Sequence, residues 1–252
     1  MQKFNLVAAT ILGTSLSIGL AAAMPAAHAV SLIPQQEGEI GLTNLTSVSS
    51  TTIDTTSMGF NVTSLQFDSK LGLSRLFVDK NGTENTWGLG IKFGATDLGT
   101  NPNSSQYWYR PVAIGTDNKV LEGGQLEVGR FLFNLDKTYE EVSLDFVDVE
   151  DNGFSGILEV NGQSVSNLLN AGPNDGTQSL TLKNVKSFVV QMGNSGKNYS
   201  NPNARFATGD GVRLSGLGVT KAVPEPTTTL GLGAMAVAGL LGLRRKKASQ
   251  VG

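Results

Sequence analysis

The sequence predicts an all-β protein, a jelly-roll-like antiparallel β-sandwich, and three observations lead to this fold class. Short runs of β-branched and aromatic residues, separated by turn residues, recur through most of the chain. No stretch of useful length among them shows the apolar period of a helix. The 31 glycines, several of them in Asn-Gly pairs, suit the tight connections of antiparallel strands.

The first 29 residues have the composition of a secretory signal peptide. Lys3 precedes an apolar stretch over 4–23, and the stretch is followed by Ala27 and Ala29 on either side of a histidine. Small residues at these two positions are typical of a cleavage site. We predict that signal peptidase cuts after Ala29, so that the mature chain begins at Val30.

Residues 30–58 are rich in Ser and Thr and contain few large apolar side chains. We predict an extended leader there, with at most one edge strand near 40–45. The predicted sandwich domain covers residues 59–222. Its predicted strands are 61–67, 74–78, 87–93, 112–114, 126–133, 142–149, 154–160, 180–182, 185–192 and 212–220.

Charge and residue usage exclude several classes of function. Residues 30–226 contain 21 acidic and 14 basic residues, a net charge of −7, which argues against a nucleic-acid partner. The single histidine, His28, leaves with the signal peptide, and the chain has no cysteine. Catalysis by Ser-His-Asp or Cys-His, histidine-ligated zinc, iron–sulfur clusters and disulfides are therefore excluded from the mature protein.

The densest group of carboxylates follows the predicted strand 142–149. The apolar alternation changes phase there, and a bulge near 146–147 would place Asp145, Asp148 and Glu150 on one polar face, with Asp151 at the following turn. Three interpretations are open: a solvated acidic face, an oxygen-ligand site for Ca²⁺, or the carboxylate pair of a glycan hydrolase.

A second candidate site lies in the predicted loop 94–111. Tyr107, Trp108 and Tyr109 follow a segment rich in Asn and Ser. Aromatic rings beside amide and carboxylate groups suit sugar binding, because a ring can stack on the C–H face of a sugar. Packing of Trp108 in the core is the alternative interpretation.

The last thirty residues, 223–252, have a distinct order of parts. Two prolines end the preceding sheet, an apolar run over 230–243 follows, and a basic cluster closes the segment. The fourteen apolar residues form a short predicted helix of about 21 Å, against a hydrocarbon core of about 30 Å. The residues that define this order are Val223, Pro224, Glu225, Pro226, Arg244, Arg245, Lys246 and Lys247.

This order of Pro-Glu-Pro, apolar helix and basic end resembles the PEP-CTERM sorting signal of exported bacterial proteins. The resemblance implies an exosortase as processing partner, with removal of the tail near Pro-Glu-Pro. It also implies transient anchoring in the membrane through the helix, followed by release to the cell surface or the extracellular space. The basic cluster would stay on the cytoplasmic side of the membrane.

A second resemblance concerns the stretch 126–131, which reads Leu-Glu-Val-Gly-Arg-Phe. Together with 139–151, it is similar to the LEVG family, a group of cyanobacterial PEP-CTERM proteins. The apolar alternation changes phase at Gly129, so we predict a glycine bulge there and a structural role for the motif.

Taken together, the sequence predicts an exported, exosortase-sorted protein of the cell surface or extracellular matrix. Its β-sandwich is expected to be a binding or structural module and not an enzyme. The alternatives are a Ca²⁺-dependent carbohydrate-binding module and a two-carboxylate glycan hydrolase. The expected partners are signal peptidase, exosortase, the membrane and an extracellular polysaccharide.

Overall fold

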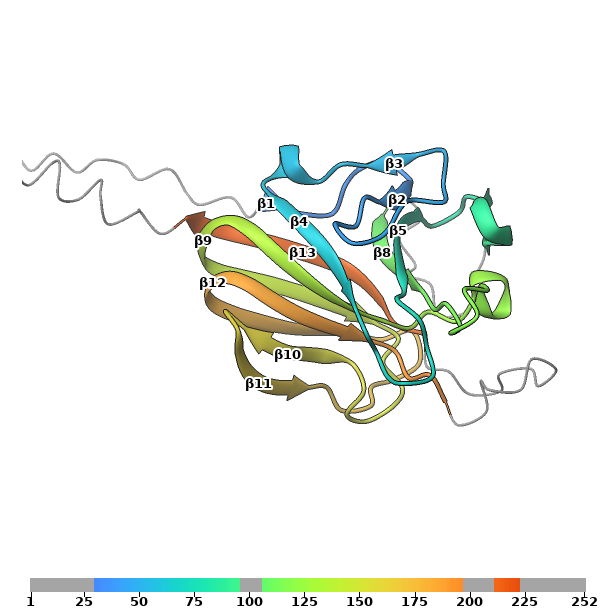
Figure 1. The fold of residues 1–252 in the computed structure, drawn as a ribbon. Coiled ribbons are helices and arrows are strands. Elements are labelled where there is room, and N and C mark those ends of the chain that lie inside the picture. The colour runs from blue at the N-terminus through green and yellow to red at the C-terminus, as the bar shows by residue number, and fades with distance from the viewer. Residues whose placement is uncertain (1–29, 96–105, 197–210, 223–252) are drawn as a thin grey trace, which may run out of the picture.

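A computed structural model describes residues 30–95, 106–196 and 211–222 of the chain, which form β-strands joined by turns and short 3₁₀ helices (Figure 1). The strands are β1 (Val30–Ser31), β2 (Gly38–Ile40), β3 (Thr52–Ile53), β4 (Phe60–Leu65), β5 (Arg75–Lys80), β6 (Asn85–Thr86), β7 (Lys92–Phe93), β8 (Tyr107–Val112), β9 (Gly129–Val147), β10 (Gly156–Val160), β11 (Gln163–Leu168), β12 (Thr177–Met192) and β13 (Arg213–Ala222). The 3₁₀ helices are η1 (Thr56–Met58), η2 (Gly88–Gly90) and η3 (Leu121–Gly124). The predicted all-β class is confirmed for the described residues.

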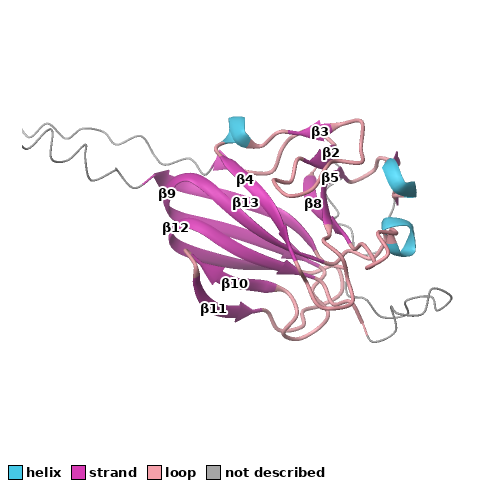
Figure 2. Ribbon diagram, viewed as in Figure 1, coloured by secondary structure: helices cyan, strands magenta, loops and turns pink. Residues whose placement is uncertain are grey.

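Eleven of these strands form one hydrogen-bonded sheet (Figure 2). Its order is β11-β10-β12-β9-β13-β8-β5-β2-β3, with β1 paired to β13 and β4 paired to β9. The sheet is mixed, because β2 and β3 run parallel while the other pairs are antiparallel. The strands β6 and β7 form a separate antiparallel pair.

The two long strands, β9 and β12, form the spine of this sheet. They pair along most of their length, but the register shifts where Lys186 faces residues 135–138 of β9. The first half of β9 pairs with β4 on its other edge, whereas the second half pairs with β13. The irregularity therefore divides the spine into two halves with different neighbours.

The two halves of the spine lie in two layers that face each other across the core. Figure 1 shows β9 and β12 curling back at one end of the molecule. Phe133, in the first half of β9, stacks on its cross-strand neighbour Phe188 of β12 at 5.0 Å between ring centroids. Across the core it meets Tyr109 of β8, the neighbour of β13 in the sheet, at 5.8 Å. The described strands thus form one large mixed sheet that folds over its core, because β9 and β12 continue through the bend, and the predicted jelly-roll-like sandwich of two sheets is not confirmed.

The leader expected over residues 30–58 is part of this fold. It contributes β1, β2 and β3 in place of at most one edge strand. Its few apolar side chains, including Leu32, Ile40 and Ile53, are buried in the same core as Phe133. The low apolar content of residues 30–58 did not predict that they belong to the core. A few buried apolar side chains are enough to attach a segment to a core.

The hairpin β10–β11 confirms one turn signal of the sequence. Asn161 and Gly162 alone connect the two strands, and their φ values are 52° and 75°. Both residues have the left-handed backbone conformation that a two-residue turn between right-twisted strands requires. The side chain of Asn161 adds to this turn by accepting backbone N–H bonds from Lys186 and Ser187.

Gly129 does not form the predicted bulge, and its φ lies outside the left-handed region. The phase change comes from a tight turn just before it, where the N–H of Val128 donates to the carbonyl of Leu126 at 3.0 Å. Glycine is required at 129 for another reason. A Cβ there would lie 2.5 Å from the ring of Phe131 and 3.0 Å from the Cβ of Ser74.

Candidate functional site

The four carboxylates of the predicted cation site do not converge. Asp145 accepts a hydrogen bond from Ser179 Oγ at 2.6 Å, on the outer face of the sheet. Asp148 Oδ1 accepts the backbone N–H of Asp175 at 2.9 Å, and Asp151 Oδ2 accepts Asn194 Nδ2 at 2.7 Å.

The fourth carboxylate, Glu150, is exposed. The described residues contain no group of three or more acidic or histidine side chains able to hold a metal ion. The described fold therefore gives no support to the Ca²⁺ prediction for Asp145, Asp148, Glu150 and Asp151.

The physical reason lies in the backbone between these carboxylates. The expected bulge at 146–147 is absent, since β9 pairs with β12 without interruption through Val147. Asp148 then takes a left-handed φ of 65° and turns the chain away from the sheet. The ladder irregularity lies on the other neighbour, β13, where Ser215 stands between the paired residues Leu214 and Gly216. Asp148 and Asp151 consequently reach different loops.

The aromatic run predicted to contact glycans lies on the strand β8, and two of its three rings are buried. Trp108 and Tyr109 of β8 are 1% and 0% exposed, and the hydroxyl of Tyr109 donates to the carbonyl of Leu32 at 2.6 Å. The prediction is wrong for these two residues because their rings are buried. Tyr107 is half-buried at the start of β8, and the ammonium of Lys80 lies 5.5 Å from its ring centroid.

Beside this run, a buried group of charged residues was missed in the sequence. Arg110 is fully buried and bonds to Asp79 Oδ2 at 2.9 Å and to Glu127 Oε1 at 2.6 Å. Glu127 Oε1 also accepts Arg213 at 2.8 Å. Burial raises the pKa of Asp79 above its ordinary value, although the charge of Arg110 acts in the opposite direction.

This group gives the stretch 126–131 a structural role. Glu127 lies between two buried apolar residues and holds arginines from β8 and β13, so it ties three segments together. The sequence contained a signal for it. Arg110 and Glu127 are single charges of opposite sign within two apolar runs, a pattern that predicts a buried pair, because an unpaired buried charge is very costly.

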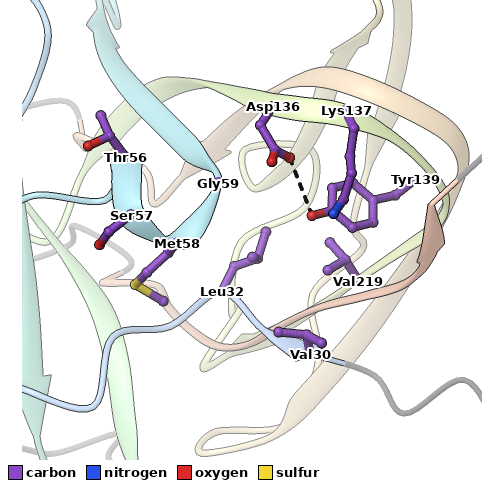
Figure 3. Close-up of a pocket in the computed structure, with 10 residues that line it drawn as sticks. All are labelled: Val30, Leu32, Thr56, Ser57, Met58, Gly59, Asp136, Lys137, Tyr139 and Val219. Carbon is purple, nitrogen blue, oxygen red and sulfur yellow. Dashed lines mark hydrogen bonds between the residues drawn. The ribbon is translucent and has the colours of Figure 1, made fainter. Parts of the chain in front are cut away.

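A cavity lies at the end of the sheet where β1 begins (Figure 3). Its volume is about 470 Å³. Residues from β1, η1, β9 and β13 surround it: Val30, Leu32, Thr56, Ser57, Met58, Gly59, Asp136, Lys137, Tyr139 and Val219. Leu32 and Val219 are buried apolar side chains, whereas Ser57 and Lys137 are exposed.

The polar wall of this cavity comes from the bend of β9. The hydroxyl of Tyr139 donates to Asp136 Oδ1 at 3.5 Å, and the ammonium of Lys137 lies 5.4 Å from the ring centroid of Tyr139. Burial, and then the negative charge of Asp136, raise the pKa of Tyr139. The phenol therefore stays protonated at neutral pH and can donate or accept hydrogen bonds at the cavity wall.

Both ends of the described domain lie beside this cavity. Val30 of β1 pairs with Val219 of β13, and Ala222, the last residue of β13, pairs with Tyr139. The mature amino terminus expected from the sequence and the exit of the carboxyl-terminal segment thus lie at the same end of the sheet (Figure 1).

A comparison with protein families found one match, to a family described as the PEP-CTERM protein-sorting motif, over residues 222–246. The chain carries a PEP-CTERM sorting motif. This motif implies export, processing by an exosortase and location at the cell surface or outside the cell. Comparisons with curated proteins and with solved structures found no match.

The sorting motif begins where the sheet ends. The matched region starts at Ala222, which is still paired in β13. No linker therefore separates the folded domain from the sorting motif. The resemblance of 126–131 to the LEVG family is not tested by these comparisons and stays a prediction.

The sorting and cleavage residues themselves lie outside the described residues. They are Ala27, Ala29, Val223, Pro224, Glu225, Pro226, Arg244, Arg245, Lys246 and Lys247. The predicted helix over 230–243 also lies outside them. Within the described ranges, none of the helices has the length and apolar character to cross a membrane.

Proposed function

We propose that this PEP-CTERM protein displays its β domain on the cell surface or in the extracellular matrix, as a binding or structural module without catalytic activity. The observation that carries the proposal is the position of the sorting motif, which starts on the last residue of β13. The domain before it is then the cargo of the sorting system. Cleavage of the signal peptide after Ala29 and transient anchoring by 230–243 belong to the same proposal.

The distribution of the carboxylates supports a role without catalysis. A glycan hydrolase of the two-carboxylate type needs an acid and a base or nucleophile about 5–9.5 Å apart across a cleft. Asp145, Asp148 and Asp151 accept hydrogen bonds from three different segments, and none of them lines the cavity of Figure 3. Their contacts are those of side chains that hold loops and strands together.

The sorting part is tested in cells that produce the full chain. Truncation after Ala222 should give a folded protein that is released to the soluble fraction. Replacing the basic residues 244–247 by neutral ones should reduce processing of the tail. Intact mass measurement of the exported protein checks both points. Exported wild-type protein that keeps its basic end would contradict processing.

The binding part is tested with purified exported protein. We propose an extracellular polysaccharide as the partner, since matrix polymers are what a displayed domain meets first. Cosedimentation of the protein with the polysaccharide fraction of the producing cells should exceed that of an unrelated acidic protein at matched ionic strength. Equal sedimentation of the two proteins would contradict polysaccharide binding, and the proposal would then be limited to a structural role.

A further inference from the structure

The distance between the folded domain and the membrane is limited by the sequence after β13. Seven residues, 223–229, separate Ala222 from the apolar run that begins at Leu230. Even when fully extended, seven residues span at most about 25 Å. An enzyme that acts on this spacer at the membrane surface must therefore come close to the end of the sheet from which β13 leaves.

That end of the sheet has the composition of an interface. The cavity of Figure 3 has an apolar base, formed by Leu32 and Val219, and a polar and charged rim that includes Ser57, Asp136 and Lys137. Val30, at the edge, is apolar and 60% exposed. An apolar centre inside a polar rim is the usual anatomy of a surface that binds another protein.

We propose that the end of the domain around this cavity is a docking surface for the membrane-embedded sorting enzyme that processes the tail. The inference rests on the proposed sorting function and adds the surface that the enzyme contacts. The sorting enzyme is chosen as the partner because the tail, which leaves β13 beside the cavity, brings this enzyme within reach of it. Contact there raises the effective concentration of the spacer at the enzyme.

The surface exists only in the folded domain. Its residues come from β1, η1, the bend of β9 and β13, segments that are far apart in the sequence and meet through the β1–β13 and β9–β13 ladders. Docking thereby couples processing of the tail to completed folding. A chain whose β1 or β13 is not yet in place lacks the surface and is processed more slowly.

The first test uses surface variants of the full chain and follows conversion of precursor to processed protein in a pulse–chase experiment. Lys137→Glu reverses a charge on the rim, and Ser57→Trp fills the mouth of the cavity. Each should slow conversion about tenfold, which corresponds to about 1.4 kcal/mol of lost binding. The melting temperatures of the exported proteins should match that of the wild type.

Matched controls separate docking from general effects of charge and size. Lys119→Glu makes the same charge change at a side chain that is 81% exposed and does not line the cavity. Ser164→Trp adds the same bulk on the exposed strand β11. Both should be processed at the wild-type rate. Equal rates for the cavity variants and these controls would overturn the docking surface.

The second test lengthens the spacer between the folded domain and the apolar run. A spacer of about 20 Gly and Ser residues between Ala222 and Val223 lowers the effective concentration of the docked enzyme at its cleavage site. Processing should become slower. Faster processing would mean that the folded domain only obstructs the enzyme, and would overturn docking. Absence of processing in the wild type would instead refute the sorting proposal, so the two failures are distinguishable.

Discussion

At the scale of single residues, steric contact with neighbouring side chains explains the glycine at position 129 better than its backbone conformation does. Gly129 follows the turn at Leu126–Val128 and has an ordinary φ, but its Cα faces the ring of Phe131 and the side chain of Ser74. A phase change in the apolar pattern correctly indicated an irregularity near this glycine. The alternation alone could not show whether the glycine made the turn or left room for a ring.

We expect Gly129→Ala to destabilise the domain by about 1–3 kcal/mol, because the added methyl group overlaps the Phe131 ring. Urea denaturation of the exported protein measures the loss. In a Phe131→Leu background the same change should cost less, since the smaller side chain relieves the overlap. An equal cost in both backgrounds would assign the effect to the backbone and contradict the steric explanation.

A second prediction concerns alkaline pH. Burial raises the pKa of Tyr109 well above the value of about 10 that it has in the unfolded chain. Below that value the phenol is protonated in both states. Above it only the unfolded chain loses the proton, so the free energy of unfolding should fall with rising pH, by up to about 1.4 kcal/mol per pH unit for this group.

The measurement is urea denaturation at several values between about pH 8 and about pH 11. Tyr109→Phe is the control, because it removes the titrating group and keeps the ring. The variant loses the hydrogen bond to Leu32 at every pH, but its alkaline decline should be less steep than that of the wild type. Parallel declines would show that Tyr109 does not titrate on unfolding.

At the scale of elements, the sequence located most strands but divided the longest ones. The predicted strands 126–133 and 142–149 fall largely on the single strand β9, and 180–182 and 185–192 both fall on β12. Asp136 and Lys137 lie between the first two predicted strands, and adjacent charged residues in a sequence are typical of a turn. Both side chains are exposed in the structure. In the structure they lie in the bend of a strand that continues, a distinction that depends on pairing partners and not on local composition.

The two predicted sites failed for a related reason. The spacing of Asp145, Asp148 and Glu150 indicated a shared face, but one left-handed residue, Asp148, redirects the chain. Trp108 and Tyr109 were predicted to lie in the long loop 94–111, which begins with a segment rich in Asn and Ser and also contains Arg110. That arginine is buried and paired with Asp79 and Glu127, which are distant in the sequence. Neither outcome can be read from residues that are neighbours along the chain.

The segment 30–58 provides a test at this scale. Ile40 of β2 is fully buried in the main core, so Ile40→Ala should destabilise the domain by about 2–5 kcal/mol. Val30→Ala, in the same segment but largely exposed, should change stability by less than about 0.5 kcal/mol. Thermal or urea denaturation measures both. A leader that lay outside the core would show equally small effects for the two variants.

At the scale of the whole molecule, the two ends of the domain are held together by a strand pair. Val30 and Val219 are directly opposite each other in antiparallel β1 and β13. Opposite residues in such a pair have Cα atoms about 4.5–5.5 Å apart, a separation that a disulfide can bridge. The chain has no cysteine of its own, so an introduced pair can react only with itself or with another molecule.

We therefore expect the double variant Val30→Cys, Val219→Cys to form an intramolecular disulfide in the exported protein. Thiol titration and intact mass, with and without reductant, measure its formation, and the oxidised form should melt at a higher temperature than the reduced form. Val165→Cys with Val219→Cys is the control, because β11 and β13 lie apart in the sheet. Free thiols in the first variant would contradict the pairing of β1 with β13.

The central position of β13 also has a mechanical consequence. Tension on the tail acts along this strand, whereas its interstrand hydrogen bonds to β9 on one edge, and to β8 and β1 on the other, lie across the direction of pull. Extracting β13 by force requires the bonds on both edges to shear together, not to open one after another. We expect a domain pulled by this tail to resist extraction of β13, whereas a peripheral terminal strand would peel away.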